Sequence, residues 1–208
     1  MADVTPGAED CERGEGSHAP AGLQPPPAEA AIKSLLVLGG ARSGKSCYAQ
    51  RLAESSGLDP VLIATAQPLD AEMEARIARH AALRSARWTV IEEPYALSGA
   101  LRREARQRRI VVADCATLWL SNLMLRGGDP EAAAQELAQS IAGLEGPVIF
   151  VSNEVGGGIV PDNALARSFR DAQGLLNQAL AQACEYVVLI SAGIALKLKP
   201  SPGIEIRF

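Results

Sequence analysis

The sequence has few of the residues that mark several common classes of protein. Only 4% of its 208 residues are aromatic, two are histidine and four are cysteine. The cysteines are Cys11, Cys47, Cys115 and Cys184. Since no two of them form a C-x-x-C pair, neither a zinc site nor a disulfide framework is indicated. This cysteine usage fits a reducing compartment.

The net charge and the lack of long hydrophobic runs argue against further classes of protein. The formal net charge is −4, whereas a nucleic-acid-binding domain usually presents a basic face. The one marked basic run, LRREARQRR at 101–109, is interpreted as a solvated helix face. No stretch reaches the roughly 18 apolar residues that a membrane span needs. The first residues include acidic side chains and no apolar core, so no secretory signal is indicated and we expect a cytoplasmic protein.

Composition divides the chain at residue 31. Residues 1–31 are rich in Pro, Gly, Ala and Glu and poor in large apolar side chains. Such a segment buries too little surface to offset its ordering entropy, which predicts a disordered N-terminal tail. Residues 32–208 are expected to form one domain.

Within that domain, short apolar runs alternate with segments of helical periodicity. We predict strands at 34–39, 60–65, 110–114, 147–152 and 186–191, with 203–208 as a candidate edge strand. This alternation is typical of an α/β fold with a mainly parallel sheet. Ligands bind such sheets beyond the carboxyl ends of the strands, which places Thr65, Asp114 and Ser152 near one rim.

A glycine-rich loop supplies the first functional motif. Residues 39–46, GGARSGKS, match G-x-x-x-x-G-K-[ST] between a predicted strand and a predicted helix, the context that this motif requires. Backbone N–H groups of such a loop hold phosphate oxygens, Lys45 reaches the β- and γ-phosphates, and the Ser46 hydroxyl ligates Mg²⁺. The predicted nucleotide contacts in the loop are Gly39, Gly40, Ala41, Arg42, Ser43, Gly44, Lys45 and Ser46. The motif predicts a P-loop NTPase-like three-layer fold.

The apolar run that ends at Asp114 resembles a Walker B strand, which brings one carboxylate to the Mg²⁺ ion. The alternative interpretation is that Asp114 caps the segment that follows it.

The loop motif alone does not identify the reaction. The Asn-Lys-x-Asp pattern by which Ras-type GTPases recognise guanine is absent from the sequence, which disfavours a switch protein.

The segment 69–88 is predicted to be a helix that carries a histidine. Its residues on one face at helical spacing are Leu69, Met73, Ile77, His80 and Arg84. A neutral imidazole near nucleotide phosphates can attack phosphorus and form a covalent N–P bond. Arg76, Arg79 and Arg84 can offset the developing charge. A histidine with only a structural role is the alternative, and the spacing leaves it open.

The chain resembles the bifunctional adenosylcobinamide kinase / adenosylcobinamide-phosphate guanylyltransferase family. The resembling segments are 39–46, IATAQPLDAEMEARIARH at 63–80, DCATLWLSNL at 114–123, VSNEVGGGIVPDNALARSFRDAQGLLNQ at 151–178 and VVLISAGIALKLK at 187–199. The resemblance implies a P-loop α/β homotrimer with two activities. ATP or GTP phosphorylates the aminopropanol hydroxyl of adenosylcobinamide. GTP then transfers GMP to that phosphate through a guanylylated histidine, which releases pyrophosphate and forms adenosylcobinamide-GDP.

The resemblance also implies roles for single residues. His80 takes the position of the guanylylated histidine, and Glu92 and Asp114 match nucleotide-binding positions, although Glu93 is adjacent and the first assignment could shift by one residue. The other implied nucleotide contacts are Thr65, Ala66, Gln67, Ala81, Ala82, Leu83 and Arg84. Gly157 stands where the family commonly has Met, which leaves the polar groups of Asn153 and Glu154 in place. Ala116 replaces a larger apolar residue, and the segment after His80 is less basic than usual.

The last predicted helix, 163–185, has two distinct faces. Its apolar stripe comprises Leu165, Phe169, Ala172, Leu176 and Ala183. Its polar face comprises Arg167, Arg170 and Asn177, which are either solvated or line a substrate or subunit surface.

Two other functions of the chain stay open from the residues alone. One is a P-loop small-molecule kinase without guanylyl transfer, and the other is a GTP-binding assembly or regulatory protein.

Overall fold

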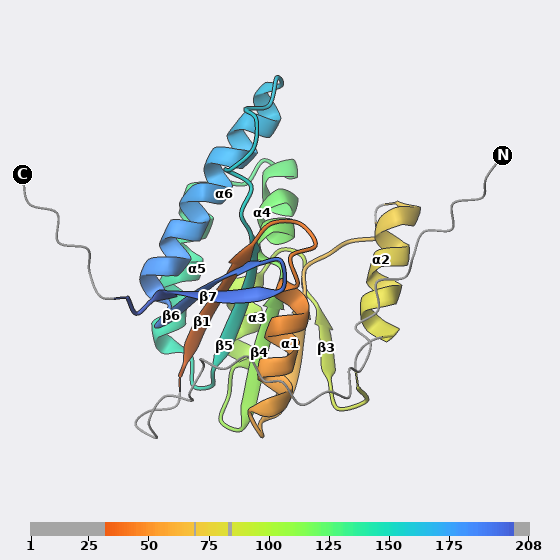
Figure 1. Ribbon diagram of the computed structural model, residues 1–208, viewed down its shortest axis with the longest axis vertical. Coiled ribbons are helices and arrows are strands. Elements are labelled where there is room, and N and C mark those ends of the chain that lie inside the picture. The colour runs from red at the N-terminus through yellow and green to blue at the C-terminus, as the bar shows by residue number, and fades with distance from the viewer. Residues whose placement is uncertain (1–31, 69, 83–84, 202–208) are drawn as a thin grey trace, which may run out of the picture. The chain divides into compact units, whose positions relative to one another are not determined.

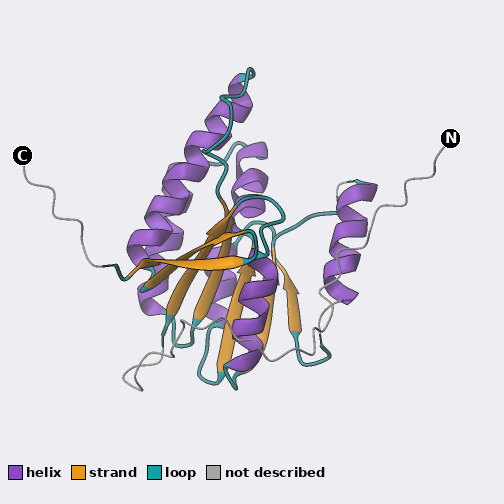
Figure 2. Ribbon diagram, viewed as in Figure 1, coloured by secondary structure: helices purple, strands orange, loops and turns teal. Residues whose placement is uncertain are grey.

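The computed structural model describes residues 32–68, 70–82 and 85–201. The predicted tail at 1–31 and the candidate edge strand at 203–208 lie outside these residues. Within the described part, seven strands form one sheet in the order β3-β2-β4-β5-β1-β6-β7. Helices lie on both faces of the sheet (Figures 1 and 2).

All neighbouring strands are parallel except β6 and β7. The strands are β1 (Ser34–Gly39), β2 (Asp59–Ala64), β3 (Thr89–Glu92), β4 (Arg109–Asp114), β5 (Val148–Asn153), β6 (Tyr186–Ser191) and β7 (Ile194–Lys199). The helices are α1 (Lys45–Ser55), α2 (Ala71–Ala82), α3 (Leu97–Glu104), α4 (Ala116–Leu125), α5 (Pro130–Ser140) and α6 (Ala164–Ala183), with a short 3-10 turn η1 (Ile141–Gly143). The predicted three-layer α/β fold with a mainly parallel sheet is confirmed.

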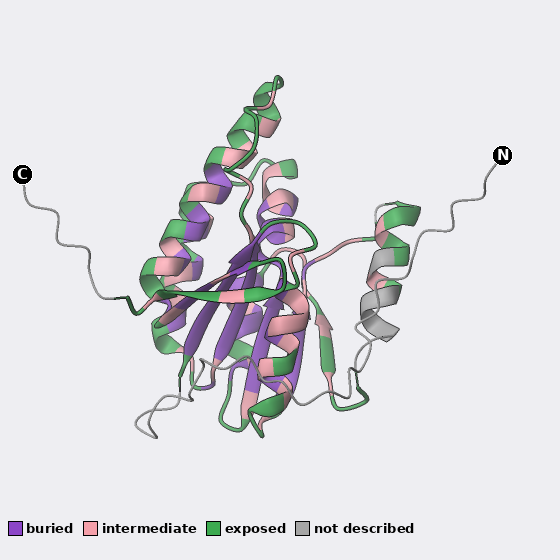
Figure 3. Ribbon diagram, in the orientation of Figure 1, coloured by how far each residue is buried: buried purple, intermediate pink, exposed green. Residues whose placement is uncertain are grey.

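The central strands are buried on both faces, as their continuous apolar sequences require (Figure 3). On one face, which we call the α1 face, Val37, Val112 and Val151 pack with Ala49 and Ala53 of α1. The opposite face, the α6 face, packs against α3, α4, α5 and α6. Since side chains alternate along a strand, each strand-end residue can be assigned to one of these faces. Within the described residues, no helix is long and apolar enough to cross a membrane.

Two strands were not predicted. β3 is only four residues long and largely exposed, and β7 alternates apolar and basic residues at an edge of the sheet. Neither shows the continuous apolar run by which a buried strand is found in a sequence. The other predicted strands, 34–39, 60–65, 110–114, 147–152 and 186–191, match β1, β2, β4, β5 and β6 to within one residue at each end.

Predicted helices end earlier than expected. In the segment 69–88, α2 spans Ala71–Ala82, and residues 85–88 are not helical. Trp88 donates its indole N–H to Glu54 Oε1 at 2.8 Å. The basic run at 101–109 is helical only to Glu104, because the chain then turns to enter β4 at Arg109. The interpretation of that whole run as a helix face is therefore wrong.

The two predicted faces of the last helix are partly wrong. Ala172 and Leu176 are buried as expected, but Leu165 is 62% exposed because α6 extends beyond the other helices at its N-terminal end (Figure 1). Ala183 is also exposed, and Leu180 is buried instead. Asn177, assigned to the polar outer face, is only 6% exposed and lies in the interior. Its amide has polar partners on β5, which sequence periodicity cannot reveal.

A lysine joins the edge strand to the end of α6. The Lys199 ammonium group donates hydrogen bonds to the carbonyl oxygens of Ala181 and Gln182, both at 2.9 Å, and of Cys184 at 2.6 Å. These carbonyls lie at the C-terminal end of the helix, where a positive charge is favourable. Burial raises the pKa of the Cys184 thiol to about 12, so this cysteine is a protonated core residue at neutral pH.

Removing this cap is expected to destabilise the domain. Lys199→Met keeps most of the aliphatic stem but leaves three carbonyl oxygens without their charged donor, and it should lower the free energy of unfolding by about 1–3 kcal/mol. Denaturant unfolding at fixed protein concentration measures the difference. Lys197→Met is the matched control, since Lys197 is exposed on the same strand and its change should stay within about 0.5 kcal/mol. Equal effects of the two substitutions would contradict the capping role.

Candidate functional site

The glycine-rich loop has the backbone form that its sequence predicts. A Cβ atom on Gly39 would collide with the carbonyl oxygen of Ile190 and the hydroxyl of Ser43, so only glycine fits at the end of β1. Gly44 has φ of 97°, a left-handed conformation that favours glycine, and it is the N-cap residue of α1. The loop thus ends at a helix N-terminus, where backbone N–H groups can receive an anion.

The Lys45 ammonium group lies within this loop. Its Nζ atom donates to the Gly40 carbonyl oxygen at 2.5 Å and to Ser43 Oγ at 3.5 Å, and the residue is only 7% exposed. The loop is braced from the neighbouring strand pair, because Gly193 in the β6–β7 turn donates its N–H to the Ser43 carbonyl at 3.0 Å. Ser46, half-buried, follows Lys45 in the first turn of α1. The loop side chains predicted to act on phosphate and Mg²⁺ are therefore adjacent.

Two carboxylates lie level with each other at the carboxyl edge of the sheet. Ala64 pairs with Asp114 on one side and with Glu92 on the other. Ala113 and Ile91 pack on the α6 face, so Asp114 and Glu92 alternate onto the α1 face, where α1 begins at the loop. The N-cap of α4 is Cys115, whose Sγ accepts from Leu118 N at 3.4 Å, so Asp114 does not cap that helix. This favours the Mg²⁺ interpretation of Asp114.

The neighbouring carboxylate, Glu93, has a structural role. Its Oε1 atom accepts from the backbone N–H groups of Tyr95 at 3.2 Å and Ala96 at 2.9 Å, where α3 begins. Its Oε2 atom lies 3.9 Å from the Arg103 guanidinium. Because Glu93 is occupied in this way, Glu92 stays the better candidate of the two for a nucleotide contact.

Thr65 ties the end of β2 to the start of α4. Its hydroxyl donates to the Cys115 carbonyl oxygen at 2.7 Å and accepts from the Cys115 N–H at 2.8 Å. Its N–H donates to the Asp114 carbonyl at 3.2 Å. Thr65 is completely buried, so its side chain holds the Asp114–Cys115 backbone in place. The predicted nucleotide contact at Thr65 stays a prediction.

The two residues after Thr65 are half-buried at the same rim. Gln67 donates to the Tyr95 hydroxyl at 2.7 Å, and the Arg126 guanidinium stacks 3.6 Å from the centroid of the Tyr95 ring. Asn122 of α4 donates to the Thr65 carbonyl oxygen at 2.8 Å. These contacts fix the segment that contains Thr65, Ala66 and Gln67 before the chain continues to α2.

His80 lies in the C-terminal part of α2, as predicted. Figure 1 shows α2 apart from the helices that cover the sheet. The side chains of Arg76, Arg79, His80, Ala81 and Ala82 lie outside the described part of the structure, as do Leu83 and Arg84 entirely. The roles of these residues stay predictions.

One polar residue of this rim was not among the predicted site residues. Asn153 ends β5 and pairs with Gly39 across the sheet. The sequence shows it as one of several polar residues after an apolar run, and only the strand order reveals that β5 lies between the loop strand and the Asp114 strand. The position of Asn153 directly after a predicted strand was the available signal.

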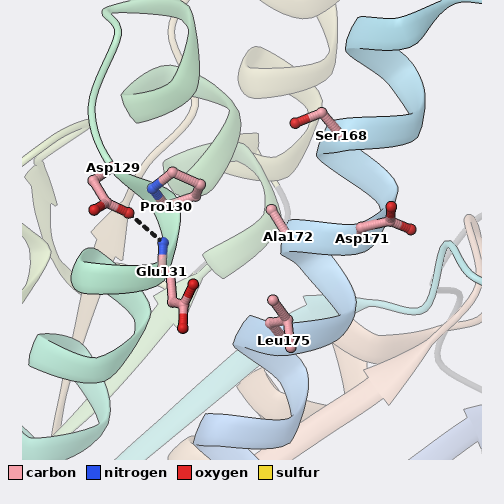
Figure 4. A pocket seen from close by; sticks show the side chains of 7 residues that line it. All are labelled: Asp129, Pro130, Glu131, Ser168, Asp171, Ala172 and Leu175. Atoms are coloured by element: carbon pink, nitrogen blue, oxygen red, sulfur yellow. Dashed lines mark hydrogen bonds between the residues drawn. The ribbon is translucent and has the colours of Figure 1, made fainter.

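A surface pocket lies between the start of α5 and the middle of α6 (Figure 4). It is lined by Asp129, Pro130, Glu131, Ser168, Asp171, Ala172 and Leu175. Asp129 caps α5, since its Oδ1 atom accepts from Glu131 N at 2.9 Å. None of the predicted site residues lines this pocket.

Comparison with known proteins agrees with the geometry of the loop. A family model described as cobinamide kinase / cobinamide phosphate guanyltransferase matches residues 35–198. The bifunctional adenosylcobalamin biosynthesis protein CobP of Pseudomonas aeruginosa is 49% identical over 170 residues, which cover 80% of this chain and 98% of that protein. The corresponding CobU proteins of Escherichia coli and Salmonella typhimurium are 38% and 39% identical over 180 residues, which cover 79% of this chain and 99% of each protein. The chain therefore belongs to the cobinamide kinase / cobinamide phosphate guanyltransferase family.

Proposed function

We propose that the loop at 39–46 serves both activities of this bifunctional family. The chain phosphorylates the aminopropanol hydroxyl of adenosylcobinamide with ATP or GTP, and it then transfers GMP from GTP to the new phosphate. The observation that carries this proposal is the placement of Lys45, Ser46 and Asp114. Lys45 and Ser46 lie at the start of α1, where the loop ends. Asp114 lies at the end of β4, on the α1 face of the sheet.

In the phosphorylation step, the loop binds and orients the triphosphate. Its backbone N–H groups and the Lys45 ammonium offset the negative charge of the β- and γ-phosphates. The Ser46 hydroxyl and the Asp114 carboxylate are oxygen donors of the kind that Mg²⁺ prefers, and they would hold this ion. The ion, when bound with the nucleotide, neutralises charge that develops on the phosphate oxygens.

In the guanylyl transfer step, His80 is the nucleophile. A ring nitrogen of the neutral imidazole attacks the α-phosphorus of GTP, an N–P bond forms, the α–β bridging P–O bond breaks, and pyrophosphate leaves. A phosphate oxygen of adenosylcobinamide phosphate then attacks the same phosphorus. The N–P bond breaks and adenosylcobinamide-GDP leaves. In chain order, His80 on α2 follows the rim segment at 65–67 and precedes β3, which ends at Glu92, and this order supports the role.

Loss of the loop lysine tests the shared site. Lys45→Ala removes the cation from the loop and should lower both cobinamide phosphorylation and GMP transfer by roughly 10²-fold or more, because charge on the phosphates is no longer offset. Steady-state assays of each reaction, with nucleotide binding by calorimetry, check this. Near-normal phosphorylation in this variant would contradict the assignment of the loop.

Labelling with [α-³²P]GTP tests the covalent intermediate. The protein should acquire an acid-labile, base-stable label, and His80→Ala should abolish it while phosphorylation of adenosylcobinamide persists, because only the transfer step needs the imidazole. His18 is the other of the two histidines in the sequence, so His18→Ala is the matched control and should keep the label. A wild-type protein that phosphorylates but takes no label would be a kinase without guanylyl transfer. A protein that hydrolyses GTP slowly, regardless of cobinamide, would support the regulatory alternative.

We also propose that the chain assembles as a homotrimer. The exposed apolar side chains of β7, Ile194, Leu196 and Leu198, which are 66%, 51% and 46% exposed, support a contact with another copy. The single chain has a mass of 21.8 kDa, so light scattering on a sizing column should give about three times this value. Leu196→Lys should lower the measured mass by adding a charge to the contact. A wild-type mass equal to that of one chain would overturn the proposal.

A further inference from the structure

Asn153 occupies a position between the triphosphate loop and the Asp114 strand. β5, which it ends, is hydrogen-bonded to β1 on one side and to β4 on the other. Asn153 pairs with Gly39, and the next residue, Glu154, donates its N–H to the Gly39 carbonyl oxygen at 2.9 Å. The backbone of Asn153 is therefore held level with the first residue of the loop.

Alternation along β5 places the Asn153 side chain on the α1 face. Phe150 packs among the residues of the α6 face, and Ser152 is hydrogen-bonded there to α6, whereas Ile149 and Val151 pack on the α1 face. Asn153 follows the second set. It therefore shares its face of the sheet with Asp114 and with the N-terminus of α1 that carries Lys45 and Ser46.

A buried polar network fixes the Asn153 backbone from the α6 face. The Asn153 N–H donates to Thr117 Oγ1 at 2.8 Å, and the Asn153 carbonyl oxygen accepts from Asn177 Nδ2 at 3.0 Å. Asn177 Oδ1 in turn accepts from Ser152 Oγ at 2.7 Å and from Gln173 Nε2 at 2.9 Å. Because these side chains are at most 6% exposed, their hydrogen bonds are difficult to replace by water and hold the strand end in one position.

The network does not use the Asn153 carboxamide itself. Within the described residues, the structure shows no hydrogen bond from this side chain to another protein group, and the residue is half-buried. A carboxamide offers two N–H donors and a carbonyl acceptor. A half-buried amide at a fixed backbone position, next to a triphosphate loop and a Mg²⁺ carboxylate, can donate to a phosphate oxygen without reorganising during the reaction.

We infer that the Asn153 carboxamide contacts the γ-phosphoryl group and stabilises its transfer in the phosphorylation step, which rests on the proposed triphosphate site at 39–46. In that step the substrate hydroxyl oxygen attacks the γ-phosphorus and the β–γ bridging P–O bond breaks. The nucleoside diphosphate leaves, and the hydroxyl proton passes to solvent water. The Nδ2 group donates to a γ-phosphoryl oxygen while charge is redistributed over these oxygens.

Because the chain has two activities, a direct role of Asn153 at the γ-phosphoryl group can be distinguished from a purely structural role. Phosphorylation breaks the β–γ bond, whereas GMP transfer breaks the α–β bond and releases the γ-phosphate unreacted within pyrophosphate. A donor to the γ-phosphoryl group should therefore affect the kcat of phosphorylation far more than the rate of protein guanylylation. A substitution that only distorts the loop should slow both reactions together.

The experiment compares Asn153→Ala and Asn153→Asp with the wild-type protein. Phosphorylation of adenosylcobinamide by MgATP should lose about 10²-fold in kcat in both variants, the effect of removing one donor at a developing charge. The KM for ATP and the single-turnover rate of labelling by [α-³²P]GTP should change by less than about threefold in the alanine variant. The near-isosteric aspartate variant keeps the shape of the side chain but replaces the donor with a negative charge, so it tests the position even where alanine disturbs folding.

Asn163→Ala is the matched control for loss of an asparagine side chain. Asn163 caps α6 through its Oδ1 atom, which accepts from Ala166 N at 2.8 Å, and its loss should lower thermal stability without changing the ratio of the two rates. Unchanged phosphorylation in the Asn153 variants, or an equal fall in both reactions, would overturn the inference. Failure of the proposed site itself would instead appear as insensitivity of both reactions to Lys45→Ala.

Discussion

The register of the parallel strands is the constraint on which the site depends. Gly39 pairs with Asn153, and Ala64 pairs with both Asp114 and Glu92, so the strand ends form one edge. A shift of any strand by a single residue would turn its terminal polar side chain to the other face. The register itself is enforced by burial, because β1, β2, β4 and β5 present apolar side chains to helices on both sides.

At this edge, the two faces of the sheet carry side chains with different roles. The α1 face carries the loop, Lys45 and the strand-end side chains that are proposed to bind phosphate and Mg²⁺. The α6 face carries a buried network of Ser152, Gln173 and Asn177 that holds the end of β5. The second group fixes the backbone from which Asn153 projects. Positioning and binding thus come from opposite sides of the same strand.

The rigid parts of the site and the proposed nucleophile lie on different kinds of element. The loop is fixed by the β6–β7 turn through Gly193, and the rim after β2 is fixed by Tyr95 and Asn122. His80 instead lies on α2, which is connected through the segments on either side of it and is drawn apart from the helices on the sheet (Figure 1).

Much of the fold and the centre of the site could be predicted because their signals are local. Five buried strands were predicted from continuous apolar runs, and the loop from its motif between a strand and a helix. β3 and β7 were missed because a short or half-exposed strand carries no such run. The helix at 69–88 was predicted too long, because helical periodicity does not reveal that residues 85–88 lead into β3 and that Trp88 contacts Glu54. Asn177 was placed on the outside because helical periodicity distinguishes apolar from polar side chains, not solvated polar groups from buried ones.

The sequence by itself determined the five buried strands, the glycine-rich loop and the resemblance of residues 33–200 to one family, since each depends on residues close together in the chain or on their order. Only the tertiary structure decided the strand order, which puts β5 between the loop strand and the Asp114 strand. It also showed that Glu93 binds the backbone of the turn before α3, and it brought Asn153 beside Gly39. These outcomes depend on pairing between strands that are far apart in sequence, and such pairing is set by the packing of both faces of the sheet at once.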